Sequence, residues 1–346
     1  MEKIERPQSL ADSRYCLGAI ARMSIQSRKV LVALSSEHAV SGSKLAEQLG
    51  VTRAAVWKQI EALRALGAPI QACAGRGYQL AWPVELLDAG TIRSALDAAT
   101  DARLADVQVH WQIDSTNSEL MRRASHGASD VTVCVAETQS AGRGRRGRQW
   151  QSLLGGNIYL SMLRRFNNGM GSLSGLSLVA GVALMQALND CGVSGIGLKW
   201  PNDVLADGHK LAGILVELGG EFLGPCFAVI GIGVNLRLPE SVGIDQPYTD
   251  LARLCGDATP SRNILIARLI ERLHELLDRF EVEGFARLRD EYARYDALVG
   301  NAISVRTNDG EVFGIADGVD TRGALRVRQG EQVITFDSAE VSVRRA

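Results

Sequence analysis

The sequence predicts an α+β protein of several domains, and three observations support this prediction. A chain of 346 residues is longer than most single domains. Its middle alternates strand-like with helix-like segments, whereas the two ends have other patterns: two short helices with a hairpin, and a series of short strands. We expect an extension over residues 1–27, a winged helix-turn-helix over 28–83, a mixed α/β domain over 84–299 and a small β-barrel over 300–346.

Composition and charge exclude several classes of protein. The chain is 46% hydrophobic and 22% charged, as globular proteins are, and 38 basic residues against 39 acidic ones leave a net charge of −1. Any attraction to nucleic acid must therefore come from a local patch. The longest apolar stretch, Leu176 to Leu188, is interrupted by polar residues and is shorter than the ~20 residues of a membrane span. We expect a soluble protein without membrane contact.

The cysteines and histidines are dispersed. None of the six cysteines forms a C-x-x-C pair, and the five histidines have no zinc-type spacing. We therefore expect free thiols in reduced cytosol and no permanently bound metal. The first residues lack an apolar signal core, which also favours a cytoplasmic location.

The N-terminal segment has the pattern of a winged helix. A helix-like run, Lys29 to Leu34, is followed by a short helix that Ser41 or Ser43 can cap and Gly50 can end. The second helix, from Arg53 to Leu66, repeats its apolar residues at helical spacing. A hairpin with the basic, glycine-rich tip 74–77 follows. Two short helices joined by a tight turn and followed by such a hairpin are typical of DNA-binding winged helices.

This segment carries a local excess of positive charge. Between Ser41 and Leu80 five basic residues stand against Glu47 and Glu61, a net charge of +3 (5 − 2). The alternative is a solvated helix face on a winged helix that binds protein. Because the hairpin tip is basic too, we favour DNA binding. The predicted DNA-contacting residues are Lys44, Thr52, Arg53, Lys58 and Arg76.

The middle and the C-terminal tail differ in the spacing of their elements. Helices are predicted over Ser115–Ser125, Leu173–Asp190 and Arg262–Phe280. Strands are predicted over Val107–Ile113, Val131–Glu137, Asn157–Leu163, Gly197–Trp200, Leu211–Leu218 and Phe227–Asn235. In the tail, short alternating runs are separated by turn pairs, which indicates an all-β unit. These pairs are Asp309-Gly310, Asp317-Gly318, Arg322-Gly323 and Gln329-Gly330.

The most informative segment is the arginine–glycine loop, residues 139–150. Gly142, Gly144 and Gly147 satisfy G-x-G-x-x-G, but neither the helix nor the acidic residue of a dinucleotide site follows. What remains is four arginines within six residues, 143–148, interleaved with glycines. Guanidinium forks and accessible backbone N–H groups suit a carboxylate or phosphate, and mutual repulsion predicts a mobile loop until an anion binds. A nucleic-acid patch is the competing interpretation.

Four further motifs accompany this loop. Lys199-Trp-Pro-Asn-Asp203 places a cation at a strand end where the proline forces a turn. Asp114-Ser-Thr-Asn117 is an N-cap or a polar binding cluster. Residues 210–217 (KLAGILVE) and 231–235 (GIGVN) are typical of buried strands with a glycine where another group approaches closely.

Together and in this order, these motifs resemble the biotin protein ligase family. The preceding winged helix and the terminal β unit match its bifunctional subclass, which joins the ligase to a biotin-operon repressor. The resemblance covers residues 28–343. It implies a central domain similar to class II aminoacyl-tRNA synthetases and an SH3-like barrel at the C-terminus.

The resemblance implies an ATP-dependent reaction in two steps. Biotin attacks ATP, as its Mg²⁺ complex, to give biotinyl-5′-adenylate, which then acylates one lysine of a biotin carboxyl carrier protein. By resemblance, catalysis falls to Arg145, Lys199 and Asp203, with Asp203 orienting Lys199 or accepting the proton of the incoming lysine. The residues around biotin are Ser115, Thr116, Asn117, Gln139, Arg143, Gly144, Arg145 and Lys199. The adenylate contacts are Trp150, Asn202, Asn235 and Tyr248. Trp150 is expected behind the arginine–glycine loop.

The adenine-covering loop of the family, here residues 238–250, lacks its usual large aromatic and offers Tyr248 instead. The subclass also implies a homodimer that forms through an edge strand when the adenylate is bound and then binds operator DNA of biotin genes. Two alternatives are a lipoate ligase, whose motifs lack the arginine–glycine loop, and a ligand-responsive repressor that has lost catalysis. Arg145 and Lys199 argue against the second.

Overall fold

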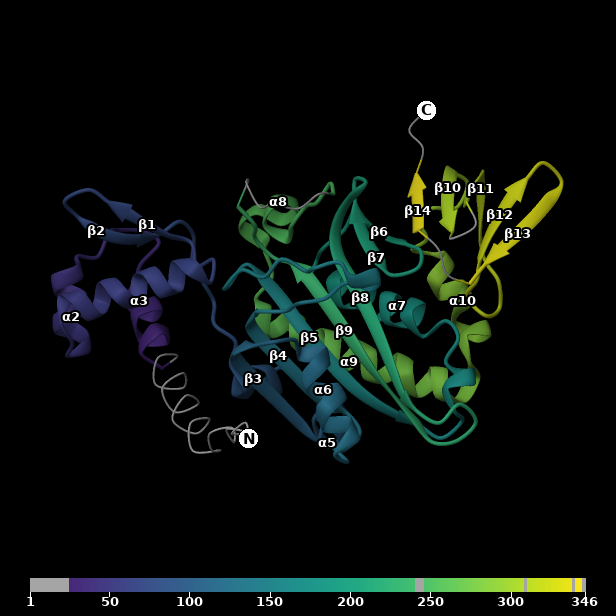
Figure 1. The fold of residues 1–346 in the computed structure, drawn as a ribbon, viewed down its shortest axis with the longest axis horizontal. Helices are drawn as coiled ribbons and strands as arrows, with labels where there is room; N and C mark the ends of the chain where they lie inside the picture. Colours follow the sequence, from purple (N-terminus) through teal and green to yellow (C-terminus); the bar gives the residue numbers. More distant parts are fainter. Residues whose placement is uncertain (1–24, 240–245, 308–309, 338–339, 344–346) are drawn as a thin grey trace, which may run out of the picture. The chain divides into compact units, whose positions relative to one another are not determined.

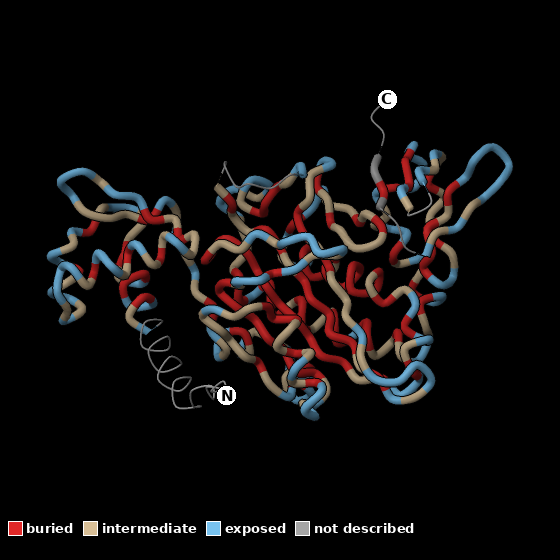
Figure 2. The backbone as a smooth tube through the Cα atoms, viewed as in Figure 1, coloured by how far each residue is buried: buried red, intermediate tan, exposed pale blue. Residues whose placement is uncertain are grey.

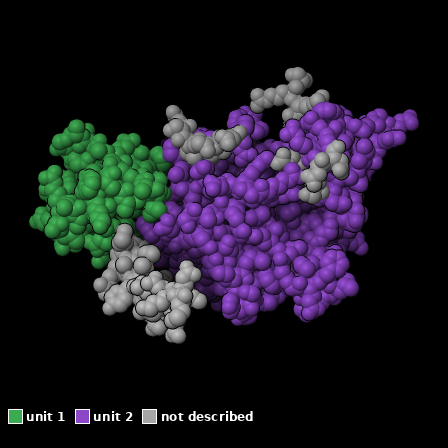
Figure 3. Space-filling view, viewed as in Figure 1, with its two compact units in different colours: residues 1–84 green, residues 85–346 purple. Residues whose placement is uncertain are grey.

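The computed structural model describes residues 25–239, 246–307, 310–337 and 340–343. The chain forms two compact units, residues 1–84 and 85–346 (Figure 3). Cys16 and most of the predicted extension lie outside the described residues.

The first unit has the predicted helix-turn-helix and hairpin. Its elements are a helix over residues 25–33, α2 (Gly42–Leu49), α3 (Arg53–Ala65), β1 (Ile70–Cys73) and β2 (Gly77–Leu80) (Figure 1). Ser41 caps α2 and Thr52 caps α3, because each side chain accepts a backbone N–H three residues on. The first helix starts earlier than predicted, and Ser27 Oγ donates to Gln59 Oε1 at 2.6 Å. The apolar stripe of α3 is fully buried.

The second unit is built on one seven-stranded mixed sheet. Only β3 and β4 run parallel; all other neighbours are antiparallel. In sheet order the strands are β3 (Asp106–Ile113), β4 (Thr132–Gln139), β5 (Asn157–Phe166), β9 (Cys226–Asn235), β8 (His209–Gly220), β7 (Asp203–Ala206) and β6 (Ile196–Lys199). The six predicted strands are confirmed, and β7 is an addition. Asp203 begins this strand, directly after the turn that Pro201 was predicted to force.

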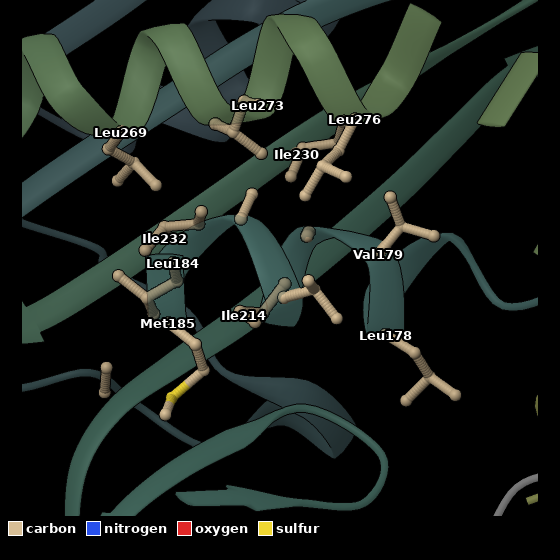
Figure 4. Packing of buried hydrophobic residues seen from close by; sticks show 14 of the residues in the cluster. Leu178, Val179, Leu184, Met185, Ile214, Ile230, Ile232, Leu269, Leu273 and Leu276 are labelled. Carbon is tan, nitrogen blue, oxygen red and sulfur yellow. The ribbon is translucent and has the colours of Figure 1, made fainter. Parts of the chain in front are cut away.

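Helices cover both faces of this sheet. On one face α6 (Thr116–Ser125) packs on β4, β5 and β9; on the other, α7 (Leu176–Asp190) and α9 (Arg262–Glu283) pack on each other and on the strands (Figures 1 and 4). The burial map shows the sheet as the buried centre of the unit (Figure 2). Eleven of the fifteen residues of α7 are buried, since strands and helices enclose most of the helix. The remaining helices are α4 (Ala89–Ser94), α5 (Ala98–Arg103), α8 (Leu251–Cys255), α10 (Phe285–Ala293) and the 3₁₀ turns η1 (Arg145–Gly147), η2 (Met170–Ser172) and η3 (Gly256–Ala258).

The C-terminal tail forms a five-stranded antiparallel sheet. Its order is β13 (Gln332–Phe336), β12 (Leu325–Gln329), β11 (Gly310–Val319), β10 (Ala302–Thr307) and β14 (Glu340–Val343). The all-β character is confirmed, while closure into a barrel stays a prediction because the described pairs do not join β13 to β14. Asp317-Gly318 was expected to be a turn; it lies within β11 at an irregularity of register.

The cysteine pattern agrees with the prediction of free thiols for the residues described. Cys73, Cys134, Cys191, Cys226 and Cys255 are unpaired. Burial raises the pKa of the Cys134 thiol to about 12, so this thiol is protonated at neutral pH. No helix of the described chain is long and apolar enough to span a membrane. The same residues contain no group of three or more side chains suited to hold a metal ion.

Candidate active site

A cavity of about 400 Å³ lies over the sheet of the second unit, where the arginine–glycine loop meets β6, β7, β8 and β9. Six of its described lining side chains are cations and one, Asp203, is a carboxylate. An excess of positive charge of this kind suits a polyanionic ligand. The predicted site residues that line it are Ser115, Thr116, Asn117, Gln139, Arg143, Gly144, Arg145, Trp150, Lys199, Asn202 and Asp203.

One part of the cavity carries neutral polar side chains at the start of α6. Thr116 donates its backbone N–H to Gln139 Oε1 at 2.8 Å and its hydroxyl to the same oxygen at 3.1 Å. Ser161 Oγ, on β5, lies 2.7 Å from Thr116 Oγ1 and 2.6 Å from Asn117 Oδ1. Ser115 caps the helix. Because these side chains are buried and mutually bonded, they form a fixed set of donors and acceptors for a polar head group.

Glu217, on β8, is a site residue that the sequence interpretation missed. It accepts hydrogen bonds from Asn117 Nδ2 at 2.8 Å and from Arg143 Nη2 at 3.0 Å. Arg143 also donates to Ser118 Oγ at 3.0 Å. Glu217 closes the KLAGILVE motif, so its position in the motif could have drawn attention to it. The guanidinium of Arg143, the first arginine of the loop, is therefore paired with the carboxylate of Glu217.

The arginine–glycine loop folds back on itself. Gly144 N donates to Arg148 O at 2.7 Å, and Trp150 N donates to Gly142 O at 3.0 Å. At the turn, Arg145 Nη1 donates to Asn202 Oδ1 at 3.3 Å. Asn202 is itself fixed to β8, because its backbone and side chain both bond to Ile214. Asn202, predicted to contact the adenylate, orients Arg145 in this structure.

Lys199 and Asp203 are paired residues of the β6–β7 hairpin, and both line the cavity. Asp203 forms an ion pair with Lys210, whose Nζ lies 2.8 Å from Asp203 Oδ1, and its expected role in orienting Lys199 stays a prediction. Lys210 is a second residue that the sequence interpretation missed, although it begins the KLAGILVE motif. Its ammonium lies 5.5 Å from the centre of the Trp150 ring, a cation–π distance.

Trp150 packs against strands β8 and β9 of the sheet rather than only behind the arginine–glycine loop. A Cβ at position 213 would lie 2.9 Å from the indole, and one at 233 would lie 2.8 Å from it. Similarly, a Cβ at 231 would collide with Asn117. The close approach predicted for the glycines of KLAGILVE and GIGVN is therefore confirmed, and the approaching groups are side chains of the site.

Two predicted adenylate contacts, Asn235 and Tyr248, lie outside the described lining. Asn235 is buried and donates to Thr249 O at 3.0 Å while accepting from Asn157 Nδ2 at 3.1 Å. Tyr248 donates to Pro239 O at 3.2 Å and its ring faces Arg253. In this structure both residues hold the segment that borders the cavity. Residues 240–245 of that segment lie outside the described residues.

The C-terminal sheet takes part in the site. Val341 lines the cavity together with Trp200. Trp200 is 2% exposed and donates Nε1–H to Gly323 O, in the turn between β11 and β12, at 2.9 Å. The wall next to Lys199 is thus held by the C-terminal sheet.

In the first unit, all five predicted DNA contacts are exposed. Lys44 lies on α2, Arg53 and Lys58 on α3, Arg76 at the hairpin tip, and Thr52 combines exposure with its capping role. Arg64, counted in the basic excess, is instead engaged: it pairs with Glu61 at 2.9 Å and donates to Ile70 O. The free positive charge therefore lies toward the start of α3 and the hairpin tip.

Fold and cavity together define a ligase domain of the biotin and lipoate type that carries a helix-turn-helix unit. Three family models match: an HTH domain over residues 26–79, the biotin/lipoate A/B protein ligase family over 109–235, and the biotin protein ligase C-terminal domain over 299–344. A bifunctional ligase/repressor BirA from Salmonella typhimurium is 40% identical, and the alignment covers 88% of this chain and 93% of that protein. BirA from Escherichia coli is 38% identical, and that alignment covers 92% of this chain and 97% of that protein.

The chain belongs to the BirA family of bifunctional ligase/repressors. Among solved structures, a biotin protein ligase from Aquifex aeolicus in complex with biotin and ATP is similar. It has a TM-score of 0.61 and 28% identity, and the match covers 70% of this chain and all of that one.

Proposed function

We propose that this chain activates biotin with ATP to biotinyl-5′-adenylate and transfers the biotin to a lysine of a biotin carboxyl carrier protein. The observation that carries this proposal is the division of one cavity into a neutral polar part and a cationic part. The polar part suits the ureido group of biotin, whose donors and acceptors must be paired when buried. The cationic part suits a carboxylate meeting a triphosphate.

In the first step a biotin carboxylate oxygen attacks the α-phosphorus, and the bond to the β-phosphate breaks to release pyrophosphate. Both reactants are anions, so the protein must offset their repulsion and align them. We assign this task to Arg145, which Asn202 orients, and to Lys199 and Lys210 at the strand ends. Mg²⁺ arrives with ATP and offsets part of the phosphate charge.

In the second step the ε-amine of the carrier lysine attacks the acyl carbon, and AMP leaves. The amine must lose a proton to react, and Asp203 is the carboxylate of the described lining that could accept it. The arginine–glycine loop would shield the adenylate from water once it orders over the ligand.

Pyrophosphate release with biotin and ATP tests the ligase function. Lys199→Ala and Arg145→Gly should lower the rate at least tenfold, because each removes a cation from the reacting phosphates. Arg289→Ala, which removes a surface arginine that forms an ion pair with the exposed Asp290, is the matched control and should leave the rate unchanged. Wild-type protein that releases no pyrophosphate would favour the repressor without catalysis, and turnover with lipoate in place of biotin would favour a lipoate ligase.

The repressor function is assigned to the first unit. Lys44, Arg53, Lys58 and Arg76 offer phosphate contacts, and α3 is the helix that enters the major groove in helix-turn-helix proteins. Gel shift with the promoter of the protein's own biotin genes, with and without biotinyl-adenylate, tests it. We expect a shift that requires the adenylate and weakens steeply with salt. A gel shift that does not depend on the adenylate would contradict a link between the ligase and repressor activities.

We propose that the DNA-binding form is a homodimer. The edges of the large sheet are β3 and β6, but β7 pairs only with the first half of β8. On that side the second half of β8 pairs with no strand of the described chain, and the turn after it exposes Phe222 (66%) and Leu223 (88%). Sedimentation should show dimers with the adenylate and fewer dimers for Leu223→Asp. A monomer at high concentration with the adenylate bound would refute the dimer.

A further inference from the structure

Trp57 is a large apolar side chain left in solvent on α3. It is 58% exposed, whereas Val56, Ile60 and Leu63 of the same helix are fully buried. It is the fifth residue of α3 and stands one helical turn after Arg53. The fold of the first unit therefore does not need this indole, which occupies an outward position in the early part of the helix.

The surroundings of Trp57 indicate what kind of surface it contacts. Arg53 and Lys58 on either side are exposed cations, and Ala54, also exposed, is small enough to let another molecule come close to the helix. In the following turn, Glu61 and Arg64 neutralise each other. An apolar ring set among cations is complementary to a polyanion that displays an apolar group. In duplex DNA that group is the C5-methyl of thymine, which lies in the major groove.

We propose that Trp57 is a specificity-determining residue that packs on a thymine methyl group of the operator, while Arg53 and Lys58 contact the neighbouring phosphates. This inference rests on the proposed repressor function and adds the base that the helix selects. Phosphate contacts position a protein on DNA, whereas contacts with base edges select the sequence. Loss of Trp57 should therefore change which sequences are bound more than whether DNA is bound.

The experiment uses the full-length protein with biotin and ATP. Duplexes selected by the wild-type chain from a random pool are resynthesised with single thymines replaced by deoxyuridine, which removes only the methyl group. Wild-type binding should weaken about fourfold at one thymine per half-site. Trp57→Ala should bind the thymine and deoxyuridine duplexes equally at that position. Lys58→Ala should keep the thymine preference. It should also make the decrease of DNA affinity with salt concentration shallower, by the amount expected for the loss of about one phosphate contact.

Unfolding midpoint and pyrophosphate release should be the same for Trp57→Ala and wild type, which excludes misfolding. Equal weakening by Trp57→Ala on all duplexes, with the thymine preference intact, would overturn the inference in favour of a backbone contact. No change in binding or preference would overturn it too. If the wild-type chain selects no duplex at all, the repressor function fails first and the inference falls with it.

Discussion

The N-terminal unit and the C-terminal sheet are both short terminal segments, yet they relate to the rest of the chain in different ways. Residues 1–84 form a compact unit with buried residues of their own (Figure 3). By contrast, Ile303, Val305 and Leu325 of the C-terminal sheet belong to the same apolar cluster as the seven-stranded sheet. Of these two short terminal segments, one is therefore a separate module and the other is an integral part of the ligase body.

The contacts of the C-terminal sheet explain this difference. Gly323 accepts the indole N–H of Trp200, and a Cβ at this position would lie 3.0 Å from the backbone of Gly175, at the start of α7. A small five-stranded sheet buries one face only when another element covers it. In the first unit, α3 and the hairpin cover each other. The C-terminal sheet uses the ligase body for that purpose and in return forms part of the cavity wall.

Truncation tests most directly whether the C-terminal sheet is part of the ligase body and the N-terminal unit a separate module. A chain that ends at Val299 loses the cover over part of the shared core and should not unfold cooperatively, whereas residues 85–346 should unfold at the midpoint that this unit shows in the intact chain. Thermal unfolding followed by circular dichroism checks both. Cooperative unfolding of the chain lacking 300–346 would show that the C-terminal sheet is a separate module after all.

Trp200 is buried and Trp57 is exposed, so we expect them to contribute unequally to stability. Trp200→Ala leaves a cavity between the ligase body and the C-terminal sheet and should lower the free energy of unfolding by about 3–5 kcal/mol. Trp57→Ala, at an exposed position, should change it by less than about 0.5 kcal/mol. Urea unfolding measures both values. Equal losses would mean that the exposure of the two side chains does not determine their contributions.

Substitutions of two glycines, one in each unit, should change the free energy of unfolding by smaller amounts. Gly213→Ala pushes against Trp150 and should cost about 1–3 kcal/mol in the second unit while lowering the rate of pyrophosphate release. Gly50→Ala meets no neighbour but strains a left-handed backbone (φ +64°), and should cost about 1 kcal/mol in the first unit only. Calorimetry resolves the two units. A change in ligase rate for Gly50→Ala would contradict their independence.

The smallest effect concerns His274 on α9, where burial lowers the pKa of the imidazole. The groups that act on it are Asp278 and Asp130, which raise the pKa, and Arg164 and Arg103, which lower it. The unfolded chain then binds a proton more readily than the folded one, so stability of the second unit falls as the pH drops below about 6.5 toward the lowered pKa. His274→Gln should flatten this slope, and unfolding of residues 85–346 at several pH values measures it. An unchanged slope would assign the pH dependence to other groups.

Much of the site could be predicted because its residues stand in short contiguous motifs. Thr116, Gln139, Arg145 and Lys199 were identified in this way, and the structure brings them to one cavity. Lys210 and Glu217 were missed although they are the first and last residues of the KLAGILVE motif. The reason is that local sequence does not show which way the side chain of a strand residue faces. Asn235 was assigned to the ligand for its motif, yet its amide serves buried backbone groups.

The order of the parts, most of the strands and helices, and the cluster of cations in one loop can all be predicted from the amino-acid sequence. These follow from periodicity, turn residues and charge, which act over a few residues along the chain. The folded chain adds three contacts that were not predicted: Asp203 with Lys210, Glu217 with Arg143, and the C-terminal sheet with the core of the ligase body. Such contacts join residues distant in sequence, so they depend on how strands pair and faces pack, which no local pattern contains.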